Sequence, residues 1–587
     1  MTVHRPGIAS RLVATRGGLA SVACVVVAMA IATPAPASTP AAAAARIRLH
    51  LVYTNDIHGH VAPEGATFIN PNFPPPLGGG ASAKAYVDKL RRSIAGDPNA
   101  ALLLVDAGDV WQGAPVGTLT KGEVMEQYFN AMDYDAIAPG NHEFDKGQDV
   151  VERISRNLTH EFVCCNIFKA GTDSLVEWAE PYRIVARAGL HIGIIGANTP
   201  GTEHMAFGEN IAGLQFRPIL PEVEKWRDVL LRDEKVDFVL LVMHEGLPYD
   251  AAREWQDLQQ REKEGQNIRD NVRGAMDIAH VLEGVPVIVG GHTHRGYRSP
   301  WIDPVTQAMV LETFGNGSSL GHIVLDFDRT TKQIVGWEPP RRDGLLVTLF
   351  EDEWWPDEDM RGRLRPYIET AQQGLDVKVG TSRVELTRRG GANSPMGNLV
   401  TAAMQEETRA DFAFTNLGGL RTDLAMGNLT VGDLLKVMPF DNTLCVVKMK
   451  GAMIRAIFER KGGRASQGIG FSGAQVTVDP DAPEGRRVKE LLIGGKPIER
   501  DTVYRVCTTD YLMDGNSGLG FLAEIPQDQV EFTQTLDRAA LSHYVEKHSP
   551  VSPRVDDRWR ERKGAPEAEY LRNWPAFETK PTGADAP

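Results

Sequence analysis

The sequence is poor in cysteine, in long apolar runs and in net positive charge, and each shortage excludes a class of protein. Five cysteines in 587 residues are too few for a disulfide framework. The formal net charge of −14 argues against a nucleic-acid polymer as partner, because phosphate backbones require a basic surface. Beyond the N-terminus no apolar run is long enough to cross a membrane, so no transmembrane anchor is expected.

The five cysteines also lack the spacing of a zinc site. Cys24 lies in the N-terminal apolar run and would be removed with it. Cys164 and Cys165 are adjacent in an apolar stretch at 162–167, where buried free thiols are expected. Cys445 and Cys507 could pair in an oxidising compartment, and the sequence favours neither pairing nor free thiols.

The N-terminus has the three parts of a secretory signal peptide. Arg5, Arg11 and Arg16 precede an apolar run at 19–31, and small residues follow at 33–45. No Arg-Arg pair precedes the run, which favours the general secretory route over the twin-arginine route. We therefore expect residues 1–45 to be a signal peptide and the mature protein to be secreted or periplasmic.

The chain is too long for one hydrophobic core, so at least two domains are expected. Over 46–345 continuous apolar strands alternate with helical segments, which predicts an α/β domain whose sheets are covered on both faces. Residues 346–375 are charged and Trp-rich at first and then helix-like, which predicts a linker helix. A second α/β domain is expected over 376–560, and the polar stretch 561–587 predicts a loosely held tail.

Polar side chains of metal-binding type follow five of the predicted strands in the first domain. α/β sheets place their sites at the carboxyl ends of their strands, where such loops meet. The candidates are Asp56, His58, Asp109, Asn141, His244, His292 and His294. Any one of them alone is more often a satisfied loop residue, but five such loops in this order predict one shared site.

The chemistry of these candidates indicates two divalent metal ions. Mixed carboxylate, amide and imidazole ligands suit Zn, Mn, Fe or Co better than Ca. Two ions that share one carboxylate can clamp an in-line phosphoryl displacement and supply a hydroxide at neutral pH. His142 could donate to an oxyanion, and Asp145 could hold its imidazole protonated and oriented. The predicted partner is therefore a small-molecule phosphate ester.

The motifs in these loops resemble those of a known family. They read Asn-Asp-Ile-His-Gly at 55–59, Asp-Ala-Gly-Asp at 106–109, Gly-Asn-His-Glu-Phe-Asp at 140–145 and Gly-Gly-His-Thr-His at 290–294. They are similar to those of the secreted 5′-nucleotidases and UDP-sugar hydrolases of the calcineurin-like metallophosphoesterase superfamily. The resemblance implies a four-layer α/β/β/α metallophosphoesterase sandwich, a linker helix and a C-terminal α/β substrate-recognition domain.

The resemblance also implies a role for each candidate ligand. One ion would be held by Asp56, His58, Asp109 and His294. The other would be held by Asp109, Asn141, His244 and His292, so that Asp109 bridges the two. His142 and Asp145 would form the dyad that stabilises the phosphoryl transition state. Glu143 has no implied role and is treated as structural, and four other histidines are expected at the surface or in packing: His60, His191, His204 and His280.

In the second domain, the stretches 394–399 and 416–421 resemble the signatures of the family's nucleotide-recognition domain. The implied substrate contacts are Arg389 (or Arg388), Asn416, Gly418, Gly419, Arg421, Phe440 and Tyr511. Arg421 would meet the substrate anion, and Phe440 and Tyr511 would sandwich the base, with core packing as their alternative. Removal of the Phe440 ring should therefore weaken nucleotide binding by removing a stacking face, and should leave a base-free aryl phosphate nearly unaffected.

One position departs from the family pattern. The family usually shows Gly-Gly-Asp-Gly and an aromatic residue near the end of this domain, and its Asp contacts the sugar hydroxyls. Here 517–521 reads Ser-Gly-Leu-Gly-Phe. Leu519 would then face the sugar, so we expect poor discrimination between ribonucleotides and 2′-deoxyribonucleotides.

Taken together, these features predict an exported dinuclear-metal phosphohydrolase that releases phosphate from nucleotides by metal-activated hydroxide attack. Hydrolysis of 2′,3′-cyclic nucleotides or UDP-sugars stays open, and the oligomeric state is not indicated. A thiosulfohydrolase of sulfur oxidation is one alternative, and the base-stacking pair argues against it. A non-catalytic nucleotide-binding surface protein is another, and the ligand set with its dyad argues against that.

Overall fold

The computed structural model describes residues 46–70, 73–248, 250–463, 468–526, 529–553 and 555–575. All of them belong to one compact unit, Ala45–Pro587. The predicted signal peptide at 1–45 therefore lies outside the described residues. Within the described ranges, no helix is long and apolar enough to cross a membrane.

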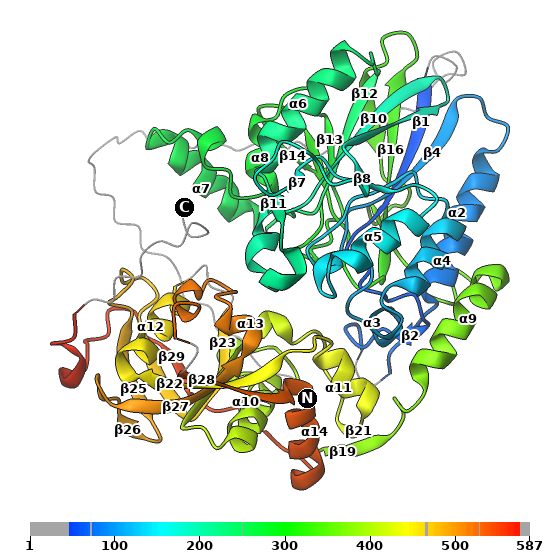
Figure 1. Ribbon diagram of the computed structural model, residues 1–587. Helices are drawn as coiled ribbons and strands as arrows, with labels where there is room; N and C mark the ends of the chain where they lie inside the picture. The colour runs from blue at the N-terminus through cyan, green and yellow to red at the C-terminus, as the bar shows by residue number, and fades with distance from the viewer. Residues whose placement is uncertain are drawn as a thin grey trace, which may run out of the picture. The chain divides into compact units, whose positions relative to one another are not determined.

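Two six-stranded sheets form the centre of the N-terminal part, residues 46–348 (Figure 1). The first sheet has the order β17-β16-β1-β4-β5, with β18 paired to β16. Its strands are β1 (Arg46–Thr54), β4 (Ala100–Asp106), β5 (Ala136–Ile137), β16 (Ser319–Asp328), β17 (Ile334–Glu338) and β18 (Leu346–Thr348). Because β18 belongs to this sheet, the sheet extends three residues past the predicted boundary at 345.

The second sheet has the order β14-β15-β13-β12-β10-β9. Its strands are β9 (Tyr182–Arg187), β10 (Leu190–Ala197), β12 (Phe238–Met243), β13 (Val287–Val289), β14 (Trp301–Ile302) and β15 (Met309–Leu311). β10, β12, β13 and β15 run parallel, so their carboxyl ends share one edge of the sheet.

Alternation along the strands separates three apolar layers. On β1, Leu49 and Leu51 pack between the two sheets, whereas Val52 packs with helices on the outer face. On β12, Leu240 faces the first sheet and Leu241 faces the helices on the far side. The N-terminal part is thus helix–sheet–sheet–helix, and the predicted α/β fold class is confirmed.

The helices of this part cover the outer faces of the sheets (Figure 1). They are α2 (Gly79–Ile94), α3 (Pro115–Leu119), α4 (Glu123–Met132), α5 (Gln148–Asn157), α6 (Ile219–Arg232), α7 (Ala251–Lys263) and α8 (Ala275–Val281). Short strand pairs complete it: β2 (Glu64–Gly65), β3 (Pro76–Leu77), β6 (Phe162–Val163), β7 (Ile167–Lys169), β8 (Ala179–Glu180) and β11 (Leu214–Phe216). The apolar stretch at 162–167 thus contributes to two short strands, between which Cys164 and Cys165 are buried and free, as predicted.

The predicted linker contains α9 (Glu358–Gln372). Asp357 caps it, since its Oδ1 accepts a hydrogen bond from the Met360 N–H at 2.9 Å. Met360 and Leu364, four residues apart, bury the same face of the helix in the apolar layer that contains α2 and α4. The helix is therefore fastened to the N-terminal part.

The C-terminal part, residues 378–575, contains a five-stranded and a four-stranded sheet. The first is β23 (Ile469–Ser472), β20 (Phe412–Asn416), β27 (Val503–Thr509), β22 (Thr443–Lys450) and β28 (Val530–Leu536). The second is β26 (Lys496–Pro497), β25 (Val488–Ile493), β24 (Ala474–Val478) and β29 (Trp559–Glu561). A separate pair is β19 (Lys378–Ser382) with β21 (Gly427–Thr430), and the helices are α10 (Pro395–Thr408), α11 (Val431–Val437), α12 (Gly451–Lys461), α13 (Asp510–Met513) and α14 (Asp537–His548).

Cys445 and Cys507 are both free and buried, so the disulfide that the sequence left open does not form. The register of β22 with β27 gives the reason. Cys445 lies opposite Thr508, and Cys507 lies opposite Val446. Positions one residue out of register point to opposite faces of a sheet, and the two thiols accordingly belong to different apolar clusters.

The polar tail expected from 561 onward is partly wrong. Tyr570 and Trp574 pack against the apolar cluster of the C-terminal part, and Leu571 is fully buried in it. The guanidinium of Arg455 donates a hydrogen bond to the Leu571 carbonyl at 3.3 Å. Composition suggested a loose tail because apolar residues are few here, but these three lie close enough in sequence to face the core together.

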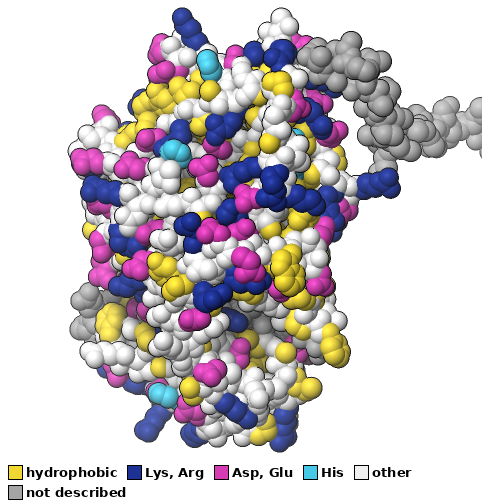
Figure 2. All heavy atoms as spheres, turned by 90° about the vertical axis from the view of Figure 1, so that its right-hand side faces the viewer, with side chains coloured by type: hydrophobic (Ala, Val, Ile, Leu, Met, Phe, Trp, Pro, Cys, Tyr) yellow, Lys and Arg dark blue, Asp and Glu magenta, His cyan; other side chains and the backbone are white. Residues whose placement is uncertain are grey.

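Figure 2 shows one face of the molecular surface. Acidic and basic side chains are interspersed across it, and hydrophobic side chains form only small groups.

Candidate active site

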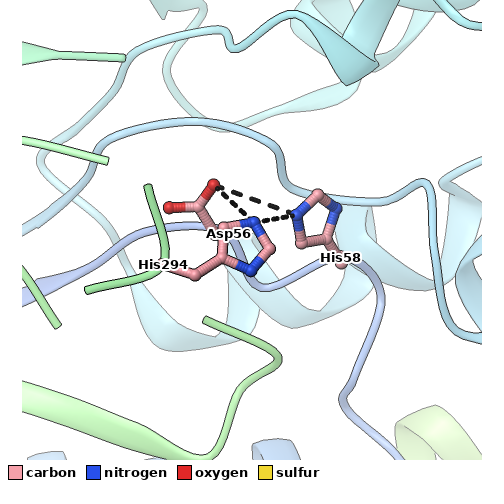
Figure 3. A group of neighbouring side chains, drawn as sticks. All are labelled: Asp56, His58 and His294. Atoms are coloured by element: carbon pink, nitrogen blue, oxygen red, sulfur yellow. Dashed lines mark hydrogen bonds and ion pairs between the residues drawn. The ribbon is translucent and has the colours of Figure 1, made fainter. Parts of the chain in front are cut away.

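Asp56, His58 and His294 point their side chains at one another from loops of both sheets (Figure 3). The Nε2 atoms of the two histidines are 3.0 Å apart. Asp56 Oδ1 lies 3.3 Å from His294 Nε2 and 3.8 Å from His58 Nε2. Three donor atoms facing one point are suited to a cation.

Asp109, His244 and His292 form a second such group. Asp109 Oδ2 lies 3.1 Å from His244 Nε2, and Asn141 Oδ1 lies 3.2 Å from the same nitrogen. Asp109 Oδ2 is also 3.8 Å from His58 Nε2, which joins this group to the first. The structure therefore brings all seven predicted ligands together.

Backbone carbonyls set the tautomers of two of these histidines. His58 Nδ1 lies 2.7 Å from the Gln112 carbonyl, and His244 Nδ1 lies 2.7 Å from the Ala107 carbonyl. An Nδ1–H that donates to a carbonyl leaves the lone pair on Nε2, the atom that faces the cluster in both residues. This is the arrangement that histidine ligands of metal sites adopt, so the residues present fit two metal ions.

The electrostatics of the cluster also favour cations. Burial lowers the pKa of His292 to about 4 and that of His58 well below its usual range, so both rings are neutral, as ligands must be. Burial acts against a charge on His244 too, but the Asp109 carboxylate outweighs it and raises the pKa of His244 to about 10, so without a metal this ring carries a proton that a bound ion would displace. Two buried carboxylates, Asp56 and Asp109, thus draw positive charge into this site.

Five of the seven candidate ligands have a backbone that L-residues rarely adopt. Their φ angles are 51° for Asp56, 50° for His58, 57° for Asp109, 73° for His292 and 55° for His294. The left-handed region costs about 1–2 kcal/mol for each such residue. Strain of this kind persists where the surrounding structure enforces it, and it concentrates at functional sites.

Gly140 is required by close approach. A Cβ at this position would lie 2.3 Å from Asp109 Oδ1 and 2.8 Å from His244 Cε1. Any side chain would therefore displace two candidate ligands.

Glu143 holds together the loop that carries Asp109 and the loop that carries Asn141. Its carboxylate accepts hydrogen bonds from the Asp109 N–H at 3.0 Å, the Val110 N–H at 2.8 Å and the Gly140 N–H. Burial raises the pKa of this carboxyl to about 8. The residue treated as structural from the sequence lies directly behind Asp109.

Glu312 does the same for two further loops, those of His244 and of His292 with His294, and sequence reasoning missed it. It is fully buried and accepts hydrogen bonds from the Leu247 N–H at 2.7 Å, the Thr293 hydroxyl at 2.6 Å and the Arg295 N–H at 2.9 Å. Leu247 follows His244, and Thr293 lies between His292 and His294. The signal was present, since Glu312 directly follows the apolar strand β15 as the other candidates follow theirs.

His142 and Asp145 lie on one short turn that contains the 3₁₀ helix His142–Phe144. His142 Nδ1 is 2.7 Å from Asp145 Oδ2, and the His142 N–H donates to Asp109 Oδ1 at 2.8 Å. Burial would lower the pKa of His142, but the carboxylates of Asp145 and Asp109 outweigh it and raise that pKa. The ring also meets that of His58 edge-on, with centroids 5.3 Å apart, so His142 adjoins the cluster.

Residues of the C-terminal part reach this cluster. Arg421 Nη2 lies 3.1 Å from His58 Nε2 and 3.5 Å from His294 Nε2. Phe440 stacks on the His142 ring, and Tyr511 meets Phe207 edge-on at 6.1 Å. These contacts place the predicted anion-binding arginine and one predicted base-stacking residue at the candidate ligands.

The other predicted substrate contacts lie around Arg421. Asn416 ends β20, and Leu417–Gly419 forms a short 3₁₀ helix in which the Gly418 carbonyl accepts from Arg421 Nη1 at 3.3 Å. Of the two arginines left open by the sequence, Arg388 pairs with Asp423 at 3.0 Å. Burial lowers the pKa of Arg421, and the positive charge of Arg388 lowers it further. Arg389 is exposed.

Leu519 does not face a sugar pocket, so that expectation was wrong. Its side chain is fully buried in the apolar cluster that also contains Leu512 and Leu522. The family Asp contacts sugar hydroxyls at this position of the motif, whereas here the apolar side chain is taken into the core. Poor ribose discrimination therefore has no basis in Leu519.

We expect Leu519→Asp to lower the free energy of unfolding by about 3 kcal/mol or more, because a carboxylate would enter an apolar cluster without a partner. Leu519→Met is the matched control and should cost less than about 1.5 kcal/mol. Urea denaturation of both variants measures the difference. A fully stable Leu519→Asp protein with a changed preference between ribo- and deoxyribonucleotides would restore the sugar-facing assignment.

Two protein-family models match the chain. The calcineurin-like phosphoesterase model matches residues 49–296, and the 5′-nucleotidase C-terminal domain model matches residues 378–524. The protein UshA of Yersinia enterocolitica is 27% identical over 542 residues, which is 85% of this chain and 91% of that protein.

Solved structures show the same architecture. A 5′-nucleotidase precursor from Thermus thermophilus superposes with a TM-score of 0.76 at 25% identity, over 89% of this chain and 100% of that one. The sulfate thiohydrolase SoxB of Thermus thermophilus superposes with a TM-score of 0.71, over 87% and 96% of the two chains. At 18% identity, this second likeness shows the fold alone.

The fold, the two candidate metal-binding sites and these matches define a metal-dependent phosphoric ester hydrolase. The chain matches a calcineurin-like phosphoesterase domain followed by a 5′-nucleotidase C-terminal domain, and the relatives that it resembles over most of its length are UshA and 5′-nucleotidases. The resemblance drawn from the motifs is thereby confirmed.

Proposed function

We propose that this protein is an exported phosphohydrolase that uses two divalent ions, zinc, manganese or a similar metal, to release phosphate from nucleotides. One observation carries the proposal: seven ligand-type side chains converge beside the His142–Asp145 pair and opposite Arg421. The names of the relatives, 5′-nucleotidase among them, support nucleotides as the substrate class. The three-part pattern at residues 1–45 supports export.

The metal ligands would be shared between two ions. Asp56, His58, Asp109 and His294 would hold one, and Asp109, Asn141, His244 and His292 the other. Bound there, the ions supply positive charge for the phosphate oxygens and lower the pKa of a water molecule. The 3.8 Å from Asp109 Oδ2 to His58 Nε2 supports Asp109 as the residue common to both.

The chain's own residues supply the remaining charge stabilisation. The Nδ1–H of His142 donates to Asp145, so the protonated ring can donate from Nε2 to a phosphoryl oxygen. Arg421 would add a second cationic group at the substrate anion, with Asn416, Gly418, Gly419 and Arg388 or Arg389 around it. Phe440 and Tyr511 would contact the base.

The division of labour follows the predicted domains. Residues 46–345 would carry the catalytic domain, 346–375 the linker and 376–560 the substrate-recognition domain. The two family models fall within the first and third of these ranges, which supports the assignment.

A phosphate-release assay tests the proposal. The full chain, loaded with Mn²⁺ or Zn²⁺, is offered nucleoside mono-, di- and triphosphates, 2′,3′-cyclic nucleotides, UDP-sugars and p-nitrophenyl phosphate. We expect phosphate from nucleoside 5′-monophosphates and complete loss of activity after chelation. If only p-nitrophenyl phosphate released phosphate, the protein would still be a phosphoesterase, but nucleotides would not be its substrates. If no compound released phosphate, the proposed function would be overturned.

A further inference from the structure

Phe440 of the C-terminal part lies flat on the imidazole of His142. Their ring centroids are 5.2 Å apart and their planes differ by 17°. The guanidinium carbon of Arg421 lies 5.8 Å from the centroid of Phe440. The phenyl ring thus lies near two groups that carry positive charge, an arrangement that the electron-rich face of an aromatic ring favours.

The residues on either side of Phe440 also contact the N-terminal part. The Pro439 carbonyl accepts a hydrogen bond from Gln112 Nε2 at 3.1 Å, and the Asp441 carboxylate binds Lys146 Nζ at 2.5 Å. Three consecutive residues, Pro439, Phe440 and Asp441, therefore hold the stack in register.

Gln112 and Lys146, the residues that Pro439 and Asp441 contact, lie on loops of the candidate site. The backbone carbonyl of Gln112 is the group that binds His58 Nδ1, and Lys146 directly follows Asp145. The segment 439–441 is thus seated on the loops that carry a candidate ligand and the dyad, which explains why Phe440 meets His142 at one defined angle.

Arg538 holds the same segment from its other side. Its Nη1 donates to the Met438 carbonyl at 2.8 Å and to the Phe440 carbonyl at 3.0 Å, and its Nη2 binds Asp441 Oδ1 at 2.9 Å. Because the backbone of Phe440 is held in this way, its ring can act as a fixed surface.

The His142 ring needs such a surface. Its hydrogen bond to Asp145 fixes one atom, Nδ1, and leaves the ring able to tilt about that contact. An aromatic ring packed on its face blocks the tilt. The angle matters because a donor acts on a transition state only when it is aimed at the atom where charge develops.

We propose that Phe440 is a positioning residue for phosphoryl transfer, one that holds the His142 imidazole at its working angle independently of any contact with a nucleotide base. The proposal rests on the proposed role of His142. It separates Phe440 from a residue that only stacks on the base, since a substrate without a base would depend on Phe440 as well.

The test uses p-nitrophenyl phosphate, which has no base, and the full metal-loaded chain. Phe440→Ala is expected to lower kcat about tenfold with KM nearly unchanged, and Phe440→Tyr to restore most of the rate. Phe532→Ala is the matched control, because Phe532 is 53% exposed on β28. An unchanged kcat in Phe440→Ala would overturn the proposal.

A double-mutant cycle shows whether the effect passes through His142. Phe440→Ala should cost nothing further in a His142→Ala background, since the ring it positions is then missing. Equal losses in both backgrounds would mean that Phe440 acts elsewhere, and would overturn the proposal as well.

A measurement independent of activity keeps the two proposals distinct. Diethyl pyrocarbonate modifies accessible imidazoles, and mass spectrometry of the peptide with His142 gives its rate of modification. The His142 side chain is 17% exposed, and Phe440→Ala should raise the rate by uncovering one face. An unchanged rate refutes the contact itself, whereas a wild type inactive on every phosphate ester refutes the proposed function.

Discussion

Asp109→Ala is expected to empty both metal sites and to lower turnover by more than about 10³-fold, since metal ions contribute several kcal/mol to transition-state charge stabilisation. Asp109 Oδ2 is 3.1 Å from His244 Nε2 and 3.8 Å from His58 Nε2, so one carboxylate reaches both groups of ligands. It also accepts the His142 N–H, so its loss would loosen the dyad too.

Elemental analysis after dialysis checks this, together with kcat at saturating metal. Wild type should hold two ions per chain and Asp109→Ala fewer than one. Asp173→Ala is the control, because that carboxylate is 96% exposed and pairs with Arg217 at the surface. One fully occupied site in Asp109→Ala would show that the carboxylate does not bridge.

His142→Ala is expected to lower kcat by about 10²–10³-fold with little change in KM. The imidazolium would act on charge that develops in the transition state, so ground-state binding should largely survive its removal. Steady-state kinetics on a nucleoside 5′-monophosphate and on p-nitrophenyl phosphate measure the loss. A variant with wild-type kcat would rule out the assigned role.

The pH profile gives a second check on the same residue. The Asp145 and Asp109 carboxylates outweigh burial and raise the pKa of His142, and its proposed role requires the protonated form. That form is complete below the raised pKa and is lost as pH rises through it, so kcat of the wild type should fall on the alkaline side. The fall should be absent in His142→Ala, and a persistent one would belong to another group.

The linear order of the motifs was enough to predict which side chains meet at the centre. Asp56, Asp109 and Asn141 each lie within four residues of the end of an apolar strand of the first sheet, and His244 and His292 follow strands of the second. Parallel strands end at a common edge, so loops far apart in sequence are brought together by sheet geometry alone. The α/β class followed from the same apolar strands.

The sequence could not predict which way a side chain points where that depends on strand register or on the packing of a neighbouring segment. Cys445 and Cys507 lie on neighbouring strands, yet a one-residue offset in register directs them to opposite faces. Leu519 occupies a motif position that the family uses for a sugar contact, and its apolar side chain packs into the core instead. Each outcome depends on where a neighbouring segment happens to lie, which no local pattern records.

The sequence by itself determined the seven candidate ligands, the dyad and the class of sheet, because these depend on short motifs and on strand-end geometry. The tertiary structure alone decided how the ligands are held. It placed Glu143 and Glu312 behind the loops, imposed a left-handed backbone on five candidate ligands and laid Phe440 on His142. These features join segments up to about 300 residues apart, and only the packing of the whole chain brings such segments into contact.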